Sequence, residues 1–319
     1  MLWRPAAASW RPSINSSRGV EMGVHRLTHY NYEIGPATAP VLAMRVGVEE
    51  ALFIPDWVEG RVRDDPATHG NIHRGNRCPA FGPIRVEGAR PGMGLCVEIL
   101  HVRVADVGIM VLRPGVGLLG GKVGKDEVLF LPIRDGHIEF PRGRRLPVAP
   151  MVGVIGVTPA TWTVRTLMTG DYGGNLDTRE IAAGARVHLP VQAPGAGLYL
   201  ADVHAAMGDG EISGSGVEVA GEVGIRVSLA ERAPVDGPLV ETEAEWITLA
   251  TDPDPETALR TAADRMVTFL ASRLRTRFEE AYLLAGAAGH AAISQVVNQS
   301  GVTCKVKFPK RLITQTSVL

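Results

Sequence analysis

Short apolar runs separated by turn residues recur along most of the chain. Each run has the length of a strand and is rich in valine and isoleucine. The runs are Val41–Val46, Leu95–Val104, Gly108–Leu112, Glu127–Ile133, Val152–Val157, Arg186–Val191, Leu198–Val203, Gly216–Val219 and Glu222–Leu229. This spacing favours a β-sandwich or a barrel over repeated βαβ units.

Two further segments have a more specific periodicity. Residues 217–227 alternate with a period of two, which is typical of a strand with one face in the core and the other in water. Acidic residues and prolines at Asp252–Glu256 predict the start of a helix over Thr257–Ser272, and a second helix is expected at about Phe278–Ala287. Because both helices lie late in the chain, the predicted class is α+β, mainly β.

The composition is that of an ordinary globular protein, and it argues against two classes of partner. Of the 319 residues, 45% are hydrophobic, and the formal net charge is -1, so there is no basic field to hold nucleic acid or an anionic membrane. Aromatic residues are scarce at 5%, and no apolar run approaches the ~20 residues of a membrane span. We therefore expect neither a nucleic-acid nor a membrane partner.

The three cysteines, Cys78, Cys96 and Cys304, include no Cys-x-x-Cys pair. A zinc ribbon or a disulfide framework is therefore not expected, and free thiols indicate a reducing compartment, which we take to be the cytoplasm. For Cys78, an inert buried side chain is favoured over a catalytic thiol.

We expect four segments along the chain. Residues 1–21 contain no acid before Glu21 and are expected to be a poorly ordered extension, with Met22 as the true start. An N-terminal β domain over 22–150 and a central β region over 151–235 should follow. A helical part with a closing strand should occupy 236–319.

The region Met168–Gly216 combines acidic residues, glycines and histidine. Side chains two apart in a strand share a face, so Asp202 and His204 should point the same way and suit one divalent ion. Glycines at 208 and 210 would allow a sharp turn that brings Glu211 back toward the pair. With Asp177, these residues would supply a mixed nitrogen and oxygen site for zinc or a similar ion.

Other polar residues have plainer interpretations. Asp171, Asp177 and Asp209 could instead be turn residues that cap local amides. Residues 68–77, with His69 and His73, read as a solvated loop. A second choice for an outlying ligand or substrate contact is His29 with Tyr30 and Tyr32.

Five segments carry motifs in a fixed order: Gly82–Gly92 (GPIRVEGARPG), Pro150–Pro159 (PMVGVIGVTP), Gly170–Asp177 (GDYGGNLD), Asp202–Glu211 (DVHAAMGDGE) and Ile293–Asn298 (ISQVVN). Together they resemble the acetamidase/formamidase family, over roughly Pro79 to Leu312. The resemblance implies a jelly-roll-like β-sandwich with smaller accessory β and helical parts. It also implies a bound divalent metal and hydrolysis of short amides to carboxylate and ammonia.

The resemblance also implies which residues form the site. The metal ligands carried over are Asp177, Asp202, His204 and Glu211, with Asp56 added on weaker local similarity. Carboxylates with one histidine favour zinc, with calcium or manganese as alternatives.

Three residues have expected catalytic roles. Glu211, if it is not itself a ligand, would take a proton from water and pass it to the departing nitrogen. Asn175 would stabilise the oxyanion. Tyr172 stands where the family commonly has a histidine, and its phenol could still donate a hydrogen bond to the carbonyl.

Two alternative functions stay open at this point. The same scaffold could act on a different C–N substrate, or the chain could be a non-catalytic, metal-stabilised binding protein. The expected partners are a small amide substrate and, as the commonest oligomer, a second copy of the chain.

Overall fold

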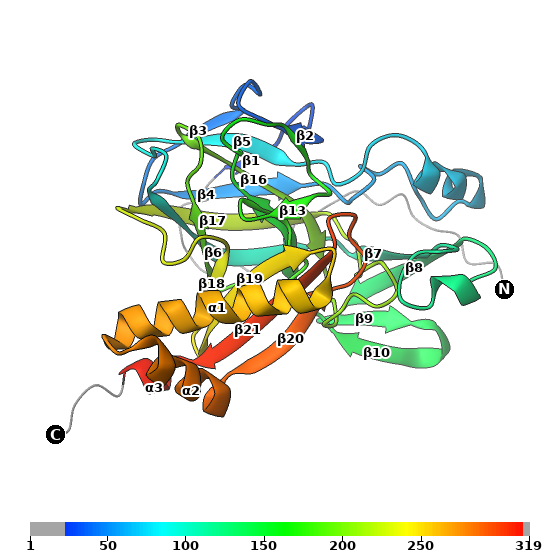
Figure 1. The fold of residues 1–319 in the computed structure, drawn as a ribbon. Helices are drawn as coiled ribbons and strands as arrows, with labels where there is room; N and C mark the ends of the chain where they lie inside the picture. Colours follow the sequence, from blue (N-terminus) through cyan, green and yellow to red (C-terminus); the bar gives the residue numbers. More distant parts are fainter. Residues whose placement is uncertain (1–22, 315–319) are drawn as a thin grey trace.

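The computed structural model describes residues 23–314 (Figure 1). The expected extension over 1–21 and the start at Met22 lie outside these residues. Most of the regular structure is strand, which confirms the α+β, mainly β class. The jelly-roll arrangement stays a prediction of the resemblance.

A nine-stranded sheet forms one side of the molecule. In spatial order its strands are β1 (Val24–His25), β4 (Glu49–Ile54), β17 (Gly221–Ala230), β6 (Gly94–Val104), β15 (Arg186–Pro190), β18 (Leu239–Glu241), β19 (Glu245–Asp252), β21 (Val302–Pro309) and β20 (His290–Gln295). The sheet takes strands from all three segments expected after residue 21. The boundaries at 150 and 235 stay predictions.

A six-stranded sheet carries most of the glycine-rich motifs. Its spatial order is β13 (Thr169–Gly170), β14 (Gly173–Asn175), β11 (Met151–Gly156), β16 (Ala196–His204), β5 (Phe81–Val86) and β3 (Leu42–Met44). Apolar side chains from this sheet and from β4, β6 and β17 join in one core cluster, because each sheet buries a valine- and leucine-rich face.

Two small sheets complete the strands. One has the order β10 (Arg144–Pro147), β9 (His137–Phe140), β8 (Glu127–Arg134) and β7 (Val107–Leu112), and it projects to one side in Figure 1. The other pairs β12 (Val164–Arg165) with β2 (Glu33–Ile34). Short 3-10 helices lie at η1 (Pro66–His73), η2 (Gly120–Lys122) and η3 (Pro141–Gly143).

Both expected helices are confirmed. Asp254 caps α1 (Pro255–Leu274) by accepting a hydrogen bond from the Thr257 amide at 3.0 Å, and α2 (Phe278–Ala288) follows. The helix α1 lies across β19 and β21 (Figure 1), where its apolar face builds a second core cluster. A short α3 (Arg311–Thr314) ends the described chain. None of the helices among the described residues is long and apolar enough to span a membrane.

The alternating segment 217–227 was only partly predicted correctly. Regular strand begins at Gly221, and residue 218 makes only isolated bridges to Ile109 and His204. The prediction that one face lies in water is wrong for the two acids on that face, since Glu218 and Glu222 are both buried. Alternation shows which residues share a face, but side chains of a neighbouring strand can cover that face: His101 and Arg103 on β6 pair with Glu222 at 3.0 and 2.7 Å.

Candidate metal centre

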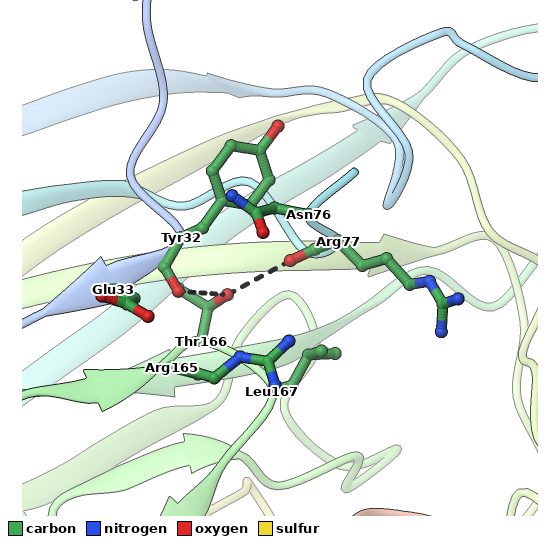
Figure 2. Close-up of a pocket in the computed structure, with 7 residues that line it drawn as sticks. All are labelled: Tyr32, Glu33, Asn76, Arg77, Arg165, Thr166 and Leu167. Atoms are coloured by element: carbon green, nitrogen blue, oxygen red, sulfur yellow. Dashed lines mark hydrogen bonds between the residues drawn. The ribbon is translucent and has the colours of Figure 1, made fainter. Parts of the chain in front are cut away.

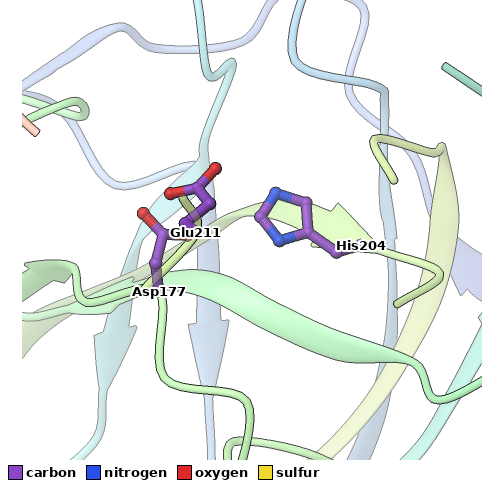
Figure 3. Close-up of side chains that lie close together, drawn as sticks. All are labelled: Asp177, His204 and Glu211. Carbon is purple, nitrogen blue, oxygen red and sulfur yellow. The ribbon is translucent and has the colours of Figure 1, made fainter. Parts of the chain in front are cut away.

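Five ionisable side chains converge in the interior beside β16. They are Asp177, Asp202, His204, Glu211 and Glu218, and none is more than 7% exposed. Two sets of ligand atoms each lie within 4.8 Å of one another: those of Asp177, His204 and Glu211, and those of Asp202, His204 and Glu218. Figure 3 shows the carboxylates of the first set side by side, with the imidazole ring directed toward them.

The strand β16 supplies Asp202 and His204, but it does not present them by simple alternation. The pairing with β11 joins Val203 to Val152 and Ala201 to Val154, so Asp202 falls outside the regular register and has a φ of 61°. The two side chains still converge, with His204 Nε2 3.7 Å from Asp202 Oδ2. The expectation that they meet is confirmed, although a local distortion of the strand brings them together.

The other acids come from loops. Asp177 follows β14, and Glu211 lies in the loop after β16. Both have positive φ, 41° and 45°, a region that residues other than glycine seldom occupy. With Asp202, three of the five converging residues therefore hold backbone conformations that cost about 1 kcal/mol or more each. Such strain persists only where surrounding contacts impose it, and it is commonest at functional sites.

Glycines make room for this cluster. A Cβ at Gly153, on β11, would lie 2.5 Å from Asp177 Oδ1 and 3.0 Å from Asp202 Oδ2. A Cβ at Gly216 would lie 2.7 Å from the His204 ring. The glycines of the motifs thus permit the close approach of ligand side chains to the backbone.

Several buried polar atoms of the cluster have no hydrogen-bond partner. They are Asn175 Oδ1, Asp177 Oδ1, His204 Nδ1 and Glu211 Oε2, whereas His204 Nε2 and Glu218 Oε2 lie 3.2 Å apart as an ion pair. The opposite oxygens of the acids are held: Asn298 donates to Asp177 Oδ2 at 2.8 Å, the Gly216 amide to Glu211 Oε1 at 3.1 Å, and Ser215 to Glu218 Oε1 at 3.3 Å. Each of these three carboxylates is therefore anchored by one oxygen and leaves the other toward the interior.

The electrostatics follow from burial of like charges. Burial, and then the charge of Asp202, raises the pKa of Asp177 to about 6. Burial also raises the pKa of Glu218 to about 8 and the pKa of Glu211 well above its usual range. For His204, burial alone would lower the pKa, but the charges of Glu218 and Asp202 outweigh it and raise the pKa well above its ordinary value.

The donor set fits a divalent cation. Four acids face a single imidazole in a region closed to water, and the raised pKa values of three of them show that without a cation they are neutralised by taking up protons. A cation bound by the unpartnered oxygens and an imidazole nitrogen would satisfy both the charge and the missing contacts.

Comparison with known proteins identifies the family. Residues 159–315 match the model of the acetamidase/formamidase family. The acetamidase of Bacillus halodurans is 33% identical and superimposes with a TM-score of 0.85, covering 91% of this chain and 98% of its own. The chain belongs to the acetamidase/formamidase family.

Two further relatives agree with this family assignment. A predicted acetamidase/formamidase from the thermophile Thermoanaerobacter tengcongensis is 33% identical, with a TM-score of 0.86 over 89% of this chain and 94% of its own. The formamidase of Methylophilus methylotrophus is 26% identical over 253 residues, which are 60% of this chain and 61% of that relative. The chain thus spans about three fifths of the length of this curated relative.

Family resemblance and geometry agree on four ligand candidates but not on Asp56. Its carboxylate accepts hydrogen bonds from the amides of Val58 (3.0 Å) and Gly60 (3.0 and 3.2 Å), so it caps a turn. Neither ligand set among the described residues includes it. Asp56 as a ligand stays a prediction, while the second candidate set contains Glu218, whose acidic character inside an apolar, alternating segment was the available signal.

The expected catalytic residues Asn175 and Tyr172 differ in their position relative to the ligand sets. Asn175 is buried near Asp177, with its side-chain oxygen unpartnered and its main-chain oxygen accepting from Asn298 at 2.9 Å. Tyr172 belongs to neither ligand set, and a Cβ at Gly170 or Gly174 would press against its ring. Burial raises the pKa of Tyr172 to about 12, so the phenol remains a hydrogen-bond donor at neutral pH.

Cys78 is free, buried and close to the cluster. Burial, followed by the charges of Asp202 and Glu218, raises the pKa of its thiol well above the usual range. A neutral thiol is a poor nucleophile, which agrees with an inert Cys78.

The outlying histidines and tyrosines are engaged elsewhere. His73 contacts Asp126, and the His69 ring lies 5.8 Å from the Phe130 ring, so the two histidines face different partners in a 3-10 helix. The Tyr30 hydroxyl donates to the Phe53 carbonyl at 3.3 Å, and the Tyr32 hydroxyl to Glu59 at 2.5 Å.

A small pocket opens near Tyr32, away from these ligand sets. Its lining includes Asn76, Arg77, Arg165 and Thr166, and the Thr166 hydroxyl lies 3.4 Å from the carbonyls of Tyr32 and Arg77 (Figure 2). Its volume of about 10 Å³ has room for roughly one water molecule. The pocket is too small to hold a substrate.

Proposed function

We propose that this chain is a metal-dependent amidase that hydrolyses a small aliphatic amide, of the formamide or acetamide type, to the carboxylate and ammonia. Membership of the acetamidase/formamidase family supports the reaction. The observation that carries the metal dependence is the set of unpartnered oxygens and one ring nitrogen buried among Asn175, Asp177, His204 and Glu211. Buried polar groups of this kind are costly unless a ligand satisfies them.

The imidazole favours zinc among the divalent ions, because calcium prefers an all-oxygen set. Manganese and calcium are the alternatives. When bound, a divalent cation polarises an amide carbonyl and lowers the pKa of water. Asp177, His204 and Glu211 would form one ligand set, and Asp202, His204 and Glu218 the other. Since both sets share His204, this residue has the greatest influence on metal affinity.

If Glu211 is not itself a ligand, it is our candidate for proton transfer. The Gly216 amide fixes one of its oxygens, while Oε2 remains unpartnered. A raised pKa lets a carboxyl take a proton from water and release it to the departing nitrogen, as a general base and then a general acid must. The amide nitrogen leaves as ammonia when it receives this proton.

Asn175 and Tyr172 are proposed to act on the substrate carbonyl. An asparagine amide group and a protonated phenol are both donors, and the oxyanion formed at the carbonyl is stabilised by donors in a water-poor site. The high pKa of Tyr172 keeps its proton available for this bond.

The decisive experiment combines metal analysis with product analysis. Purified protein is expected to contain a stoichiometric divalent metal and to release ammonia from formamide, acetamide or propionamide. Chelation should abolish this release, and added metal should restore it. Full turnover by metal-free protein would refute the metal dependence.

The same assay separates the alternatives. A large rise in melting temperature with metal but no ammonia from any amide would favour a metal-stabilised binding protein. Ammonia release from a different C–N compound, and from none of the three amides, would favour another substrate on the same scaffold. The expected dimer and the cytoplasmic location also stay predictions, which size-exclusion chromatography and cell fractionation would test.

A further inference from the structure

The C-terminal hairpin, β20 and β21, lies against both loops that carry the first ligand set. The Gly210 amide donates to the Ser294 carbonyl at 2.8 Å, one residue before Glu211. Beside Asp177, the Thr178 hydroxyl donates to Ser294 Oγ at 3.0 Å. Two segments far apart in sequence from the hairpin are therefore attached to it.

Lys305, on β21, makes the charged part of this attachment. Its side chain is fully buried, and Nζ donates to both oxygens of Glu180, at 3.0 and 2.7 Å, and to Asp209 Oδ1 at 2.6 Å. Glu180 lies three residues after Asp177, and Asp209 lies two residues before Glu211. One ammonium group thus joins the two ligand loops.

The charge balance explains why such a link is needed. When both Asp177 and Glu211 are ionised, as metal binding requires, like charges within 4.8 Å repel each other and favour a wider separation of the two loops. An ammonium buried between two further carboxylates of the same loops opposes that separation. Lys307 reinforces it from the surface, with Nζ 3.2 Å from Glu180 and 2.8 Å from Glu245.

We propose that Lys305 is a positioning residue that sets the separation of Asp177 and Glu211, so that their unpartnered oxygens can bind one divalent cation. This inference rests on the proposed function for its metal. It concerns no proton transfer by Lys305, which touches neither ligand side chain directly in its hydrogen bonds.

The test uses the full chain with paired substitutions. Lys305→Met alone would leave Glu180 buried without its main partner and could prevent folding. The double variant Lys305→Met/Glu180→Gln removes charge from both sides, and Asp209 is 39% exposed and tolerates the loss. Lys310→Met is the matched control, because Lys310 pairs with Glu241 at 2.6 Å just beyond β21.

Three measurements are made on each variant: affinity of the metal-free protein for Zn²⁺ and Mn²⁺ by calorimetry, amide hydrogen exchange without metal, and kcat and KM. For the double variant we expect a 10–100-fold loss of metal affinity, the usual cost of removing a group behind a ligand. Exchange should rise within 177–181 and 207–211 specifically, and kcat should fall more than KM rises. Lys305→Arg, which keeps the charge, should restore part of the affinity.

A folded double variant with wild-type metal affinity and unchanged exchange in both segments would overturn the proposal, as would an increase spread evenly over the chain. If the double variant does not fold, Asp209→Asn removes one link only. It should raise exchange in 207–211 but not in 177–181, and equal exchange in both would count against the proposal. Failure of the proposed function is a separate outcome, seen as a wild-type protein that neither binds metal nor releases ammonia.

Discussion

The candidate metal centre and the hairpin region beside α1 both bury charged groups, but they satisfy them in different ways. At the hairpin, Lys305 finds two carboxylates, and Arg265 on α1 donates to the Leu249 carbonyl at 2.6 Å and to Asp171 at 2.5 Å. At the candidate metal centre, buried acids outnumber the one imidazole, and four buried polar atoms lack a partner. At the hairpin, charged groups of the chain itself pair with the buried charges. At the candidate metal centre, the chain supplies too few positive groups to pair with all the acids.

This contrast separates structural burial of charge from functional burial. A buried charge is tolerated when its hydrogen bonds and its countercharge are supplied together, as they are for Lys305. The same physics makes the acid cluster unfavourable unless a cation from outside the chain joins it. Such a cluster, together with positive φ at three of its residues, supports the proposed metal site.

Neutralising an unpartnered acid of the candidate metal centre should have the largest effect on activity. Glu211→Gln should lower kcat by about 10²–10⁴ with little change of fold, because amide in place of carboxylate cannot take the proton. The matched control is Glu222→Gln, since Glu222 is equally buried but already paired with His101 (3.0 Å) and Arg103 (2.7 Å). Steady-state ammonia release checks both variants. An unchanged rate for Glu211→Gln would assign Glu211 to structure.

The pH dependence of stability should differ between metal-free and metal-loaded protein. The folded-state pKa values of Asp177 (about 6) and Glu218 (about 8) are raised, so their contribution is complete below about pH 4 and is lost as pH rises through those values. For Asp177 alone this loss is on the order of 3 kcal/mol. Metal-free protein should therefore melt at a lower temperature at pH 9 than at pH 5.

Bound metal should remove or reverse this trend, because the cation stabilises the deprotonated acids. Melting curves with chelator and with metal at the two pH values check the prediction. A metal-free protein that is more stable at pH 9 would contradict it.

Filling the space beside the acids should affect metal binding and stability together. In Gly153→Ala, the new Cβ would meet Asp177 Oδ1 at 2.5 Å, so the ligands must shift. We expect a loss of about 1–3 kcal/mol in unfolding free energy, as for other overpacked sites, and weaker metal binding. Gly124→Ala is the control, because nothing lies within 4 Å of its Cβ. Denaturant titration and calorimetry are the measurements, and wild-type metal affinity in Gly153→Ala would disprove the close approach.

The smallest effect is expected for the tyrosine that departs from the family pattern. Tyr172→Phe should lower kcat/KM by no more than about tenfold, because it removes one hydrogen bond worth about 1 kcal/mol. Tyr282→Phe, an exposed position on α2, serves as the control. A loss of 10³ or more would instead place Tyr172 among the essential groups of the site.

The β-rich class, both late helices and four of the five converging side chains could be predicted from the sequence. These features are local: strand-length apolar runs, the acidic cap at Asp254, and the two-residue spacing of Asp202 and His204 are all readable along the chain. The family motifs then supplied Asp177 and Glu211.

Which acids lose contact with water, and which of them find a partner, depends on the folded arrangement of distant segments. Glu218 joins the cluster because its backbone bridges to His204 and Ile109, while Asp56 is satisfied by the amides of its own turn. Lys305 reaches Glu180 and Asp209 across 125 and 96 residues of sequence. Burial and charge pairing depend on segments brought together by folding, and no local pattern in the chain encodes the distance between them.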